Sequence, residues 1–183
     1  IMEAARMIAK SGAKPKRTIL FIGFAGEEFG LLGAQAWVKA HKDKLPKIAN
    51  LFNRDGGPEP PVGISVPQAM YDDFVKISEP IQKIRPDYPF EVKVREPRKR
   101  PTRMGGTDAS VFAIEGVPTL GFTTEDFKGY DFDYGEIWHT ERDLYTKNIP
   151  EYQEHTATVT AIIALGVANL DKQLSREGLY TEE

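Results

Sequence analysis

The stretch RTILFIGFAGEEFG, residues 17–30, places a nearly continuous apolar run directly before two adjacent glutamates. Its first part, residues 17–25, is rich in β-branched and aromatic side chains and lacks the alternation of a strand that faces water on one side. This composition predicts a central strand covered on both faces, which is typical of parallel sheets under layers of helices. Residues 17–25 therefore favour an α/β fold.

Segments on both sides of this stretch fit the same fold. Residues 1–11 repeat apolar side chains at helical spacing and stop before a glycine, which predicts a helix. The other expected helices are residues 29–44, 70–84, 108–114 and 150–174, the other expected strands are residues 47–52, 91–95 and 117–123, and the expected loops are residues 58–67 and 125–138. Strands that alternate with helices predict one domain over residues 1–183, with a three-layer α/β/α arrangement around a mixed, mostly parallel sheet.

The overall charge gives no support for a nucleic-acid-binding protein. The 183 residues carry a net charge of −3, whereas binding to nucleic acid needs a basic face. One basic cluster occurs among prolines and is expected to be a solvated loop; it consists of Arg98, Lys99, Arg100 and Arg103. No stretch approaches the roughly 20 apolar residues that a membrane-spanning helix requires.

The chain contains no cysteine. Disulfides and thiolate ligands are therefore excluded, and a metal site would have to use His, Asp and Glu side chains. The compartment stays open, because a protein without cysteine tolerates oxidising and reducing surroundings alike.

Polar side chains gather where the predicted strands end, which is where open α/β sheets place their ligand-binding groups. Glu27 and Glu28 follow the first predicted strand, Asp55 follows the second, and His139 lies in a polar loop beyond the last. Each has an ordinary explanation when taken alone, because acids favour helix starts, Asp-Gly is a common turn and a loop histidine usually lies at the surface. Asp108, which follows two glycines and a threonine, likewise reads as a helix N-cap.

Taken together and in this order, these residues resemble metallopeptidase family 28, the group that contains dizinc aminopeptidases, carboxypeptidase Q and the glutaminyl cyclases. The resemblance runs from the helix before FIGFAGEEFGLLGAQAWV to the helix after WHTERDLY, so it covers nearly the whole chain. Its most specific element is the succession of a strand, Gly-Glu-Glu, Gly-Leu-Leu-Gly and a helix. The resemblance implies a zinc-exopeptidase-like fold and hydrolysis of a terminal peptide bond, with an aminopeptidase as the first expectation.

The resemblance also assigns roles to the matching positions. Glu27 aligns with the general base, which takes a proton from the metal-activated water and delivers it to the leaving amine. Glu28 and His139 align with ligands of one zinc, and Asp55 aligns with a ligand of the second. Asp108 matches an acid that orients the substrate or supports the site from outside the metal shell.

Two segments of the family pattern have no counterpart in this chain, a His-x-Asp segment and an Asp-Asp-x-x-x-Gly segment. They supply a His ligand and the Asp that bridges both zincs, so Glu28, His139 and Asp55 leave each zinc short of the usual three protein ligands. The expectation is a domain without the first strands of its sheet, inactive alone, with zinc binding reduced or absent. An uncovered sheet edge would favour self-association.

The residues leave three alternatives open. A glutaminyl cyclase-like acyltransferase would use a single zinc with the same Glu27 as its acid and base. A non-catalytic domain of the same fold would have lost its metals, and an unrelated α/β domain would use these acids only as caps and turns. The compartment is not evident from the sequence, although the resemblance implies a secreted or periplasmic parent protein.

The loop of residues 125–138 leads directly into His139 and carries five aromatic side chains beside five acids. Tyr130 and Phe132 are candidates for contact with a peptide or aminoacyl substrate, and the acids would attract a terminal ammonium group. The alternative is a loop that packs its aromatic side chains onto its own domain.

Overall fold

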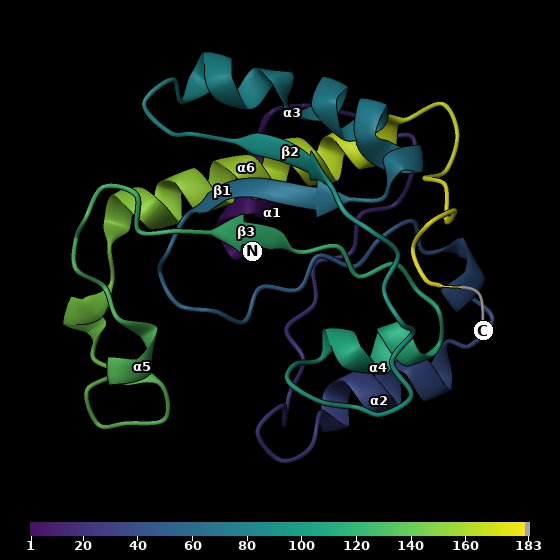
Figure 1. Cartoon of the computed structure of the whole chain (residues 1–183), viewed down its shortest axis with the longest axis horizontal. Helices are drawn as coiled ribbons and strands as arrows, with labels where there is room; N and C mark the ends of the chain where they lie inside the picture. The colour runs from purple at the N-terminus through teal and green to yellow at the C-terminus, as the bar shows by residue number, and fades with distance from the viewer. Residues whose placement is uncertain (182–183) are drawn as a thin grey trace.

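The structure, a computed structural model, describes residues 1–181 and contains a three-stranded sheet (Figure 1). The central strand β1 (Pro61–Val66) pairs in parallel with β2 (Glu91–Val94) and antiparallel with β3 (Phe122–Thr124). Gly63 lies opposite Glu91 on one side of β1 and opposite Thr123 on the other. The sheet is therefore mixed, and the predicted α/β class is confirmed.

Three helices pack around this sheet. The long helix α6 (Pro150–Asn169) lies along one face of the sheet and contacts both α1 (Met2–Lys10) and α3 (Tyr71–Ile84) (Figure 1). The fully buried side chains at this junction form the first apolar core, which includes Ile64, Val66, Phe74, Val159 and Ile163. Burial of these side chains from the sheet and from α3 and α6 is the main force that holds the layers together.

A second apolar core lies under two shorter helices, α2 (Leu32–Ala40) and α4 (Ala109–Ile114). Phe112 of α4 packs against Trp37 of α2 with 5.4 Å between ring centroids, and against Phe24 at 5.8 Å. The remaining short elements are α5 (Tyr134–Ile137) and three single 3-10 turns, η1 (Leu45–Lys47), η2 (Gln68–Met70) and η3 (Tyr145–Lys147).

The C-terminal segment joins the two cores. Leu174 and Leu179 are buried in the first core. Between them in the chain, Arg176 donates hydrogen bonds to the carbonyl oxygens of Pro46 and Ile48 at 3.1 Å, beside the second core, and to that of Gly116 at 3.2 Å. One guanidinium group thus holds the edge of the second core to a segment anchored in the first.

The prediction of a central strand at residues 17–25 is wrong for the described chain. Among residues 1–181 this run has no ladder partner, and Leu20 is 62% exposed. The central strand is instead β1, in the segment 58–67, where the sequence predicts a loop with only a short extended piece. Its prolines mislead because Pro61 stands at the first position of the strand, where a missing N–H removes no interior ladder bond.

Two further strands are shorter than expected or absent. Lys47 belongs to η1, and residues 48–52 lie in no ladder. The Leu51 N–H donates to the Pro118 carbonyl of a neighbouring segment at 2.9 Å. The Asn50 side chain takes the place of the next ladder pair, since its amide both donates to and accepts from the backbone of Leu120. Of the expected strand 117–123, only the end enters the sheet, as β3.

The helix predictions hold with shifted ends. The predicted helix 150–174 ends at Asn169, where Lys16 N–H donates to the Asn169 side chain at 3.1 Å and Arg17 donates to the carbonyl of Ala168 at 3.3 Å. The predicted loop 125–138 contains the one-turn helix α5. Among residues 1–181, no helix has the length and apolar character needed to cross a bilayer.

Candidate active site

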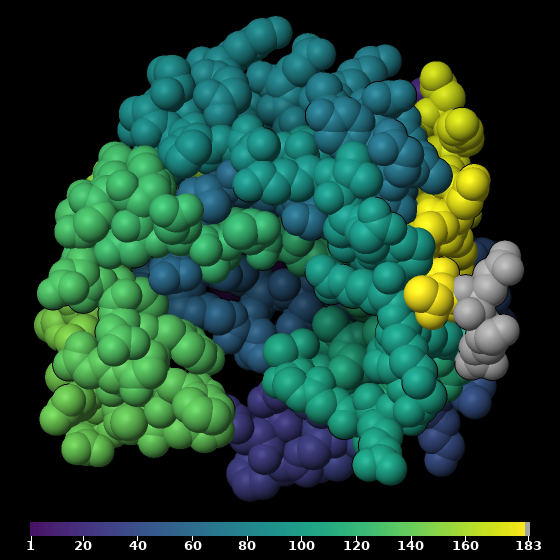
Figure 2. Space-filling model, in the orientation of Figure 1, coloured from purple at the N-terminus to yellow at the C-terminus, as the bar shows by residue number. Residues whose placement is uncertain are grey.

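A cleft of about 1560 Å³ opens between α5, the start of α6 and the turn that precedes α2. Figure 2 shows the molecule hollowed at this place, between residues 125–150 on one side and residues 100–115 on the other. The lining includes Glu27, Glu28, Arg54, Asp55, Thr107, Tyr134, Trp138 and His139. Four of the sequence-predicted residues thus share one cavity: Glu27, Glu28, Asp55 and His139.

The two glutamates lie in a closed turn built from the glycines around them. The Glu27 carbonyl accepts hydrogen bonds from the N–H groups of Gly30 and Leu31, and Gly33 N–H donates to the Ala25 carbonyl at 2.8 Å. A Cβ atom at Gly33 would come within 2.7 Å of the Ala25 backbone, so only glycine fits there. The motif therefore fixes the turn, and the turn presents both carboxylates to the cleft.

Asp55 is placed by its neighbour Arg54. The Arg54 guanidinium donates to the carbonyl oxygens of Gly57 and Glu59, so it fastens the loop that follows residue 55. Burial lowers the pKa of Arg54, with the Glu59 charge acting in the opposite direction. The Arg54 guanidinium thus binds backbone carbonyl oxygens rather than a carboxylate of the cleft.

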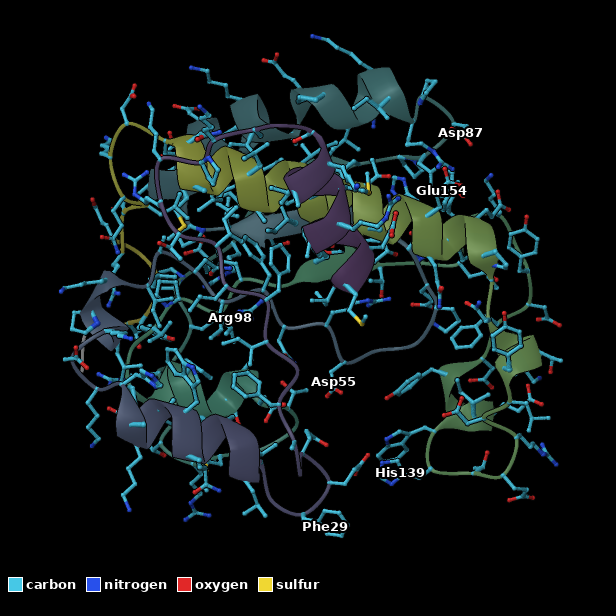
Figure 3. The ribbon with its side chains drawn as sticks, turned by 180° about the vertical axis from the view of Figure 1, so that it is seen from behind. Phe29, Asp55, Asp87, Arg98, His139 and Glu154 are labelled. Carbon is cyan, nitrogen blue, oxygen red and sulfur yellow. The ribbon has the colours of Figure 1, made fainter. Side chains whose placement is uncertain are left out.

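His139 reaches the cleft from the other side. It follows α5 and adopts a left-handed backbone with φ of 56°. Its Nε2 lies 3.2 Å from Oε1 of Glu28, although both side chains remain more than half exposed. Figure 3 shows Asp55 and His139 flanking one opening, with Phe29 at its outer rim.

The acids of the cleft influence one another. Partial burial raises the pKa of Glu27, and the charges of Asp55, Glu28 and Asp108 raise it further, while His139 lowers it. Loss of hydration raises the pKa of Asp55, and Glu28 adds to that rise. A group of carboxylates that repel one another in this way favours a bound cation or a retained proton.

Asp108 stands at the N-cap position of α4 but makes no capping hydrogen bond. It is 8% exposed, and its Oδ1 atom is buried without a hydrogen-bond partner. Burial raises its pKa, and Asp55 raises it further. The cap interpretation therefore does not account for this side chain, whose carboxyl senses the charge in the cleft.

The two aromatic candidates of the loop 125–138 differ from each other. Tyr130 packs edge-on against Tyr152 at 5.2 Å between ring centroids, and its hydroxyl donates to the Glu151 carboxylate, outside the described lining of the cleft. Phe132 packs on Gly57, where an added Cβ atom would lie 2.7 Å from its ring. Tyr134 and Trp138, which sequence reasoning did not single out, line the cleft itself. Their closeness to His139 in the chain was the available signal.

The donor atoms match zinc in kind but not in number. Imidazole nitrogen and carboxylate oxygen are zinc ligands, and Glu28 and His139 present such a pair in contact. Among residues 1–181, however, no three His, Cys, Asp or Glu side chains are grouped closely enough to hold one metal ion. A catalytic zinc takes three protein ligands, so the described residues do not by themselves provide the ligand set of one.

By its fold and its cleft, the chain is an α/β domain that brings several carboxylates and an imidazole together in one cavity. The family model described as "Peptidase family M28" matches residues 1–163. The chain therefore belongs to peptidase family M28. The resemblance that the Gly-Glu-Glu and Trp-His-Thr-Glu segments indicated is thus confirmed.

Individual relatives agree with the family. Mouse carboxypeptidase Q is 24% identical over 95% of this chain, and a probable zinc metalloprotease of Phaeosphaeria nodorum is 44% identical over 30% of it. The crystal structure of a peptidase M28 precursor from Shewanella amazonensis covers 94% of the chain with a TM-score of 0.72 and 26% identity. The chain spans about a third of the length of two of these relatives, 34% of the mouse protein and 36% of the Shewanella chain. The match to the fungal protein covers 10% of that protein.

Proposed function

We propose that the chain supplies the catalytic base and part of the metal-ligand set of a zinc-dependent exopeptidase. The observation that carries the proposal is the contact of Glu28 with His139 at 3.2 Å, with Glu27 beside it, in one cleft. The turn from Ala25 to Gly33 fixes both carboxylates relative to the same backbone. Two adjacent carboxylates can therefore have two tasks, one as a ligand and the other in proton transfer.

Glu27 is the residue for proton transfer. Its pKa is raised toward neutral pH, and a group whose pKa lies near the working pH accepts and returns protons most effectively. The carboxyl would hold the proton at an Oε atom and deliver it to the leaving amine of the cleaved bond. Burial of its carboxyl and the charge of Asp108 both raise the pKa of Glu27.

Glu28 and His139 would hold one zinc, and Asp55 would contribute to the second, with the remaining ligands coming from outside the described residues. When bound, zinc polarises the scissile carbonyl and makes water more acidic. On the ligands present, we propose that this chain alone is inactive and binds zinc weakly.

A free amino terminus is the substrate end that fits the charge of the cleft. Six carboxylates line it, against two cations, Arg54 and Lys147; the acids are Glu3, Glu27, Glu28, Asp55, Asp143 and Glu154. Both cations are already engaged, because Arg54 donates to carbonyl oxygens and Lys147 pairs with Glu136 at 3.0 Å. Two of the acids are paired as well, Glu3 with Arg6 and Glu154 with Arg85 at 3.3 Å, so four carboxylates without such a pair remain. The remaining negative potential attracts a terminal ammonium group, which favours an aminopeptidase.

A carboxypeptidase is the second candidate, because relatives that match 95% of this chain, such as the mouse protein, are named carboxypeptidase Q. Two substrates separate the candidates in the complete protein. An aminoacyl p-nitroanilide reports cleavage next to a free amino group, and an N-blocked dipeptide reports cleavage next to a free carboxylate. Hydrolysis of the blocked dipeptide alone would reverse the assignment of the substrate end.

The roles of the two glutamates are tested by paired substitutions in the complete protein. Glu27→Gln should lower kcat by about 10²–10⁴-fold, the usual contribution of a proton-transfer group, while the zinc content measured by elemental analysis stays near that of wild type. Glu28→Gln should lower the zinc content instead. Glu79→Gln, on the exposed surface of α3, is the matched control. Near-normal turnover of Glu27→Gln would remove the proposed base.

A further inference from the structure

A second, smaller pocket of about 250 Å³ lies at the basic cluster that the sequence places among prolines. Its charged lining consists of Arg95, Arg98 and Lys99, and Thr119 and Tyr180 complete its polar wall. None of its described lining residues belongs to the lining of the active-site cleft. Arg98 and Lys99 of the basic cluster are exposed loop residues, as expected, and together with Arg95 they line this separate concave site, whose position Figure 3 marks by Arg98.

Backbone contacts hold this pocket in shape. Arg98 forms an isolated parallel bridge with Tyr180, in which Arg98 N–H donates to the Leu179 carbonyl at 3.2 Å and Thr181 N–H donates to the Arg98 carbonyl at 3.0 Å. Arg95 N–H in turn donates at 2.8 Å to the carbonyl of Val66, the last residue of β1. The basic side chains therefore start from fixed backbone positions.

The positive charge of this pocket has no counterpart within the described chain. Among residues 1–181, no ion pair involves Arg95, Arg98 or Lys99. Arg95 donates from Nη1 to the carbonyl oxygen of Glu96 at 3.0 Å, and two arginines nearby also donate to carbonyl oxygens, Arg100 to Ile114 and Arg176 to Pro46. These bonds satisfy donors without neutralising charge.

The side chain of Arg95 is partly buried near the charge of Arg98. Its Nε atom is buried without a hydrogen-bond partner. Burial lowers the pKa of Arg95, and the Arg98 charge lowers it further. At Tyr180, burial raises the pKa of the hydroxyl, while Arg100, Arg95, Arg176 and Arg98 all act against that rise. Four cations thus concentrate their potential at one small cavity.

We propose that this pocket binds a small dianionic oxyanion of the phosphate type, held by Arg95, Arg98 and Lys99. Guanidinium groups bind phosphate oxygens through paired N–H donors, and an anion in this pocket would neutralise the clustered charge. The size of the cavity suits a single phosphate group, either free or as the end of a phosphomonoester. This inference does not depend on the proposed exopeptidase activity.

The test is calorimetric titration of the purified chain with inorganic phosphate at pH 8 in a buffer free of oxyanions. Wild type should bind phosphate saturably, with sulfate as a competitor and acetate as a much weaker one. Arg98→Gln should weaken binding about tenfold or more, the usual effect of losing a charge-assisted hydrogen bond. Arg103→Gln, an exposed arginine of the same segment outside the pocket lining, should bind like wild type.

Phenyl phosphate distinguishes the two sources of the group. Affinity equal to or above that of inorganic phosphate assigns the site to a phosphomonoester, and clearly lower affinity assigns it to free phosphate. Circular dichroism checks that Arg98→Gln remains folded. Absence of saturable phosphate binding in wild type, or equal affinity in folded Arg98→Gln, would overturn the proposal.

Discussion

In two extended segments of this molecule, composition suggests the wrong one as the central strand. Residues 18–24 are the more apolar, yet they lie unpaired at the surface among the described residues, with Leu20 62% exposed. Residues 61–66 begin with proline and include glycine and serine, yet they form β1, which is paired on both sides, with Ile64 1% exposed. Apolar content predicts that a segment can be extended and buried, but pairing partners decide whether it is a strand.

The largest test of this comparison is truncation of one aliphatic side chain in each segment. Ile64→Ala should lower the free energy of unfolding by about 2–5 kcal/mol, because it leaves a cavity between the sheet and its helices. Leu20→Ala removes a side chain that is already in water and should change the value by less than about 0.5 kcal/mol. Urea unfolding of both variants measures the difference. Equal losses would mean that residue 20 is buried in solution.

Acid should weaken the anchor of β1. The buried His155 on α6 holds the Pro61 carbonyl through Nε2 at 3.0 Å and stacks on Tyr88 at 3.9 Å between ring centroids. Burial lowers the pKa of His155 to about 4. The unfolded chain, with an ordinary histidine pKa of about 6.5, binds more protons between pH 6.5 and 4. The His155 contribution is therefore complete above pH 6.5 and is lost as the pH falls, by up to about 3 kcal/mol.

His155→Gln isolates this effect from the other titrating groups. Glutamine keeps a donor for the Pro61 carbonyl but does not titrate. The difference in unfolding free energy between wild type and His155→Gln should shrink as the pH falls from 7 to 4. A constant difference across this range would show that His155 is not kept neutral by the fold.

Glycines give the smallest and most local comparison. A Cβ atom at Gly63 in β1 would lie 2.4 Å from the Glu91 carbonyl oxygen, whereas one at Gly23 in the unpaired segment would meet nothing within 4 Å. Gly63→Ala should therefore destabilise the protein by about 1–3 kcal/mol, because a backbone atom must move. Gly23→Ala should be neutral or stabilising by up to about 1 kcal/mol, since alanine restricts the unfolded chain. A loss at Gly23 equal to that at Gly63 would contradict the unpaired state of residues 18–24.

The same contrast explains how far sequence reasoning reached. The spacing of apolar residues predicted α1, α3 and α6, because a helix forms its backbone hydrogen bonds within one segment and its buried face repeats at helical spacing. The helix expected over residues 29–44 begins only at Leu32, because a turn closed by the N–H groups of Gly30 and Gly33 comes first. β1 was missed because its partners, β2 and β3, come later in the chain and leave no mark on residues 61–66.

In the candidate site, too, contacts between residues far apart in the chain could not be predicted from local sequence. That Glu28 and His139 would share one cleft followed from a resemblance, and nothing local to either residue announces their contact. The unpartnered Oδ1 of Asp108 was likewise invisible, since the sequence around it fits an N-cap. Tyr134 and Trp138 were passed over because five aromatic residues in one loop look alike until α5 turns some of them inward.

Arg176 adds a consequence for the order in which the protein is made. During synthesis, the residues of α2, α4 and the sheet leave the ribosome before residue 176, so both cores can begin to collapse before their shared clamp exists. Until the segment from Leu174 to Leu179 arrives, nothing from that segment ties the carbonyl groups of residues 46, 48 and 116 to the first core. A nascent chain halted before residue 174 should therefore present two loosely linked halves to chaperones, and synthesis of residues 174–179 should lock them into one unit.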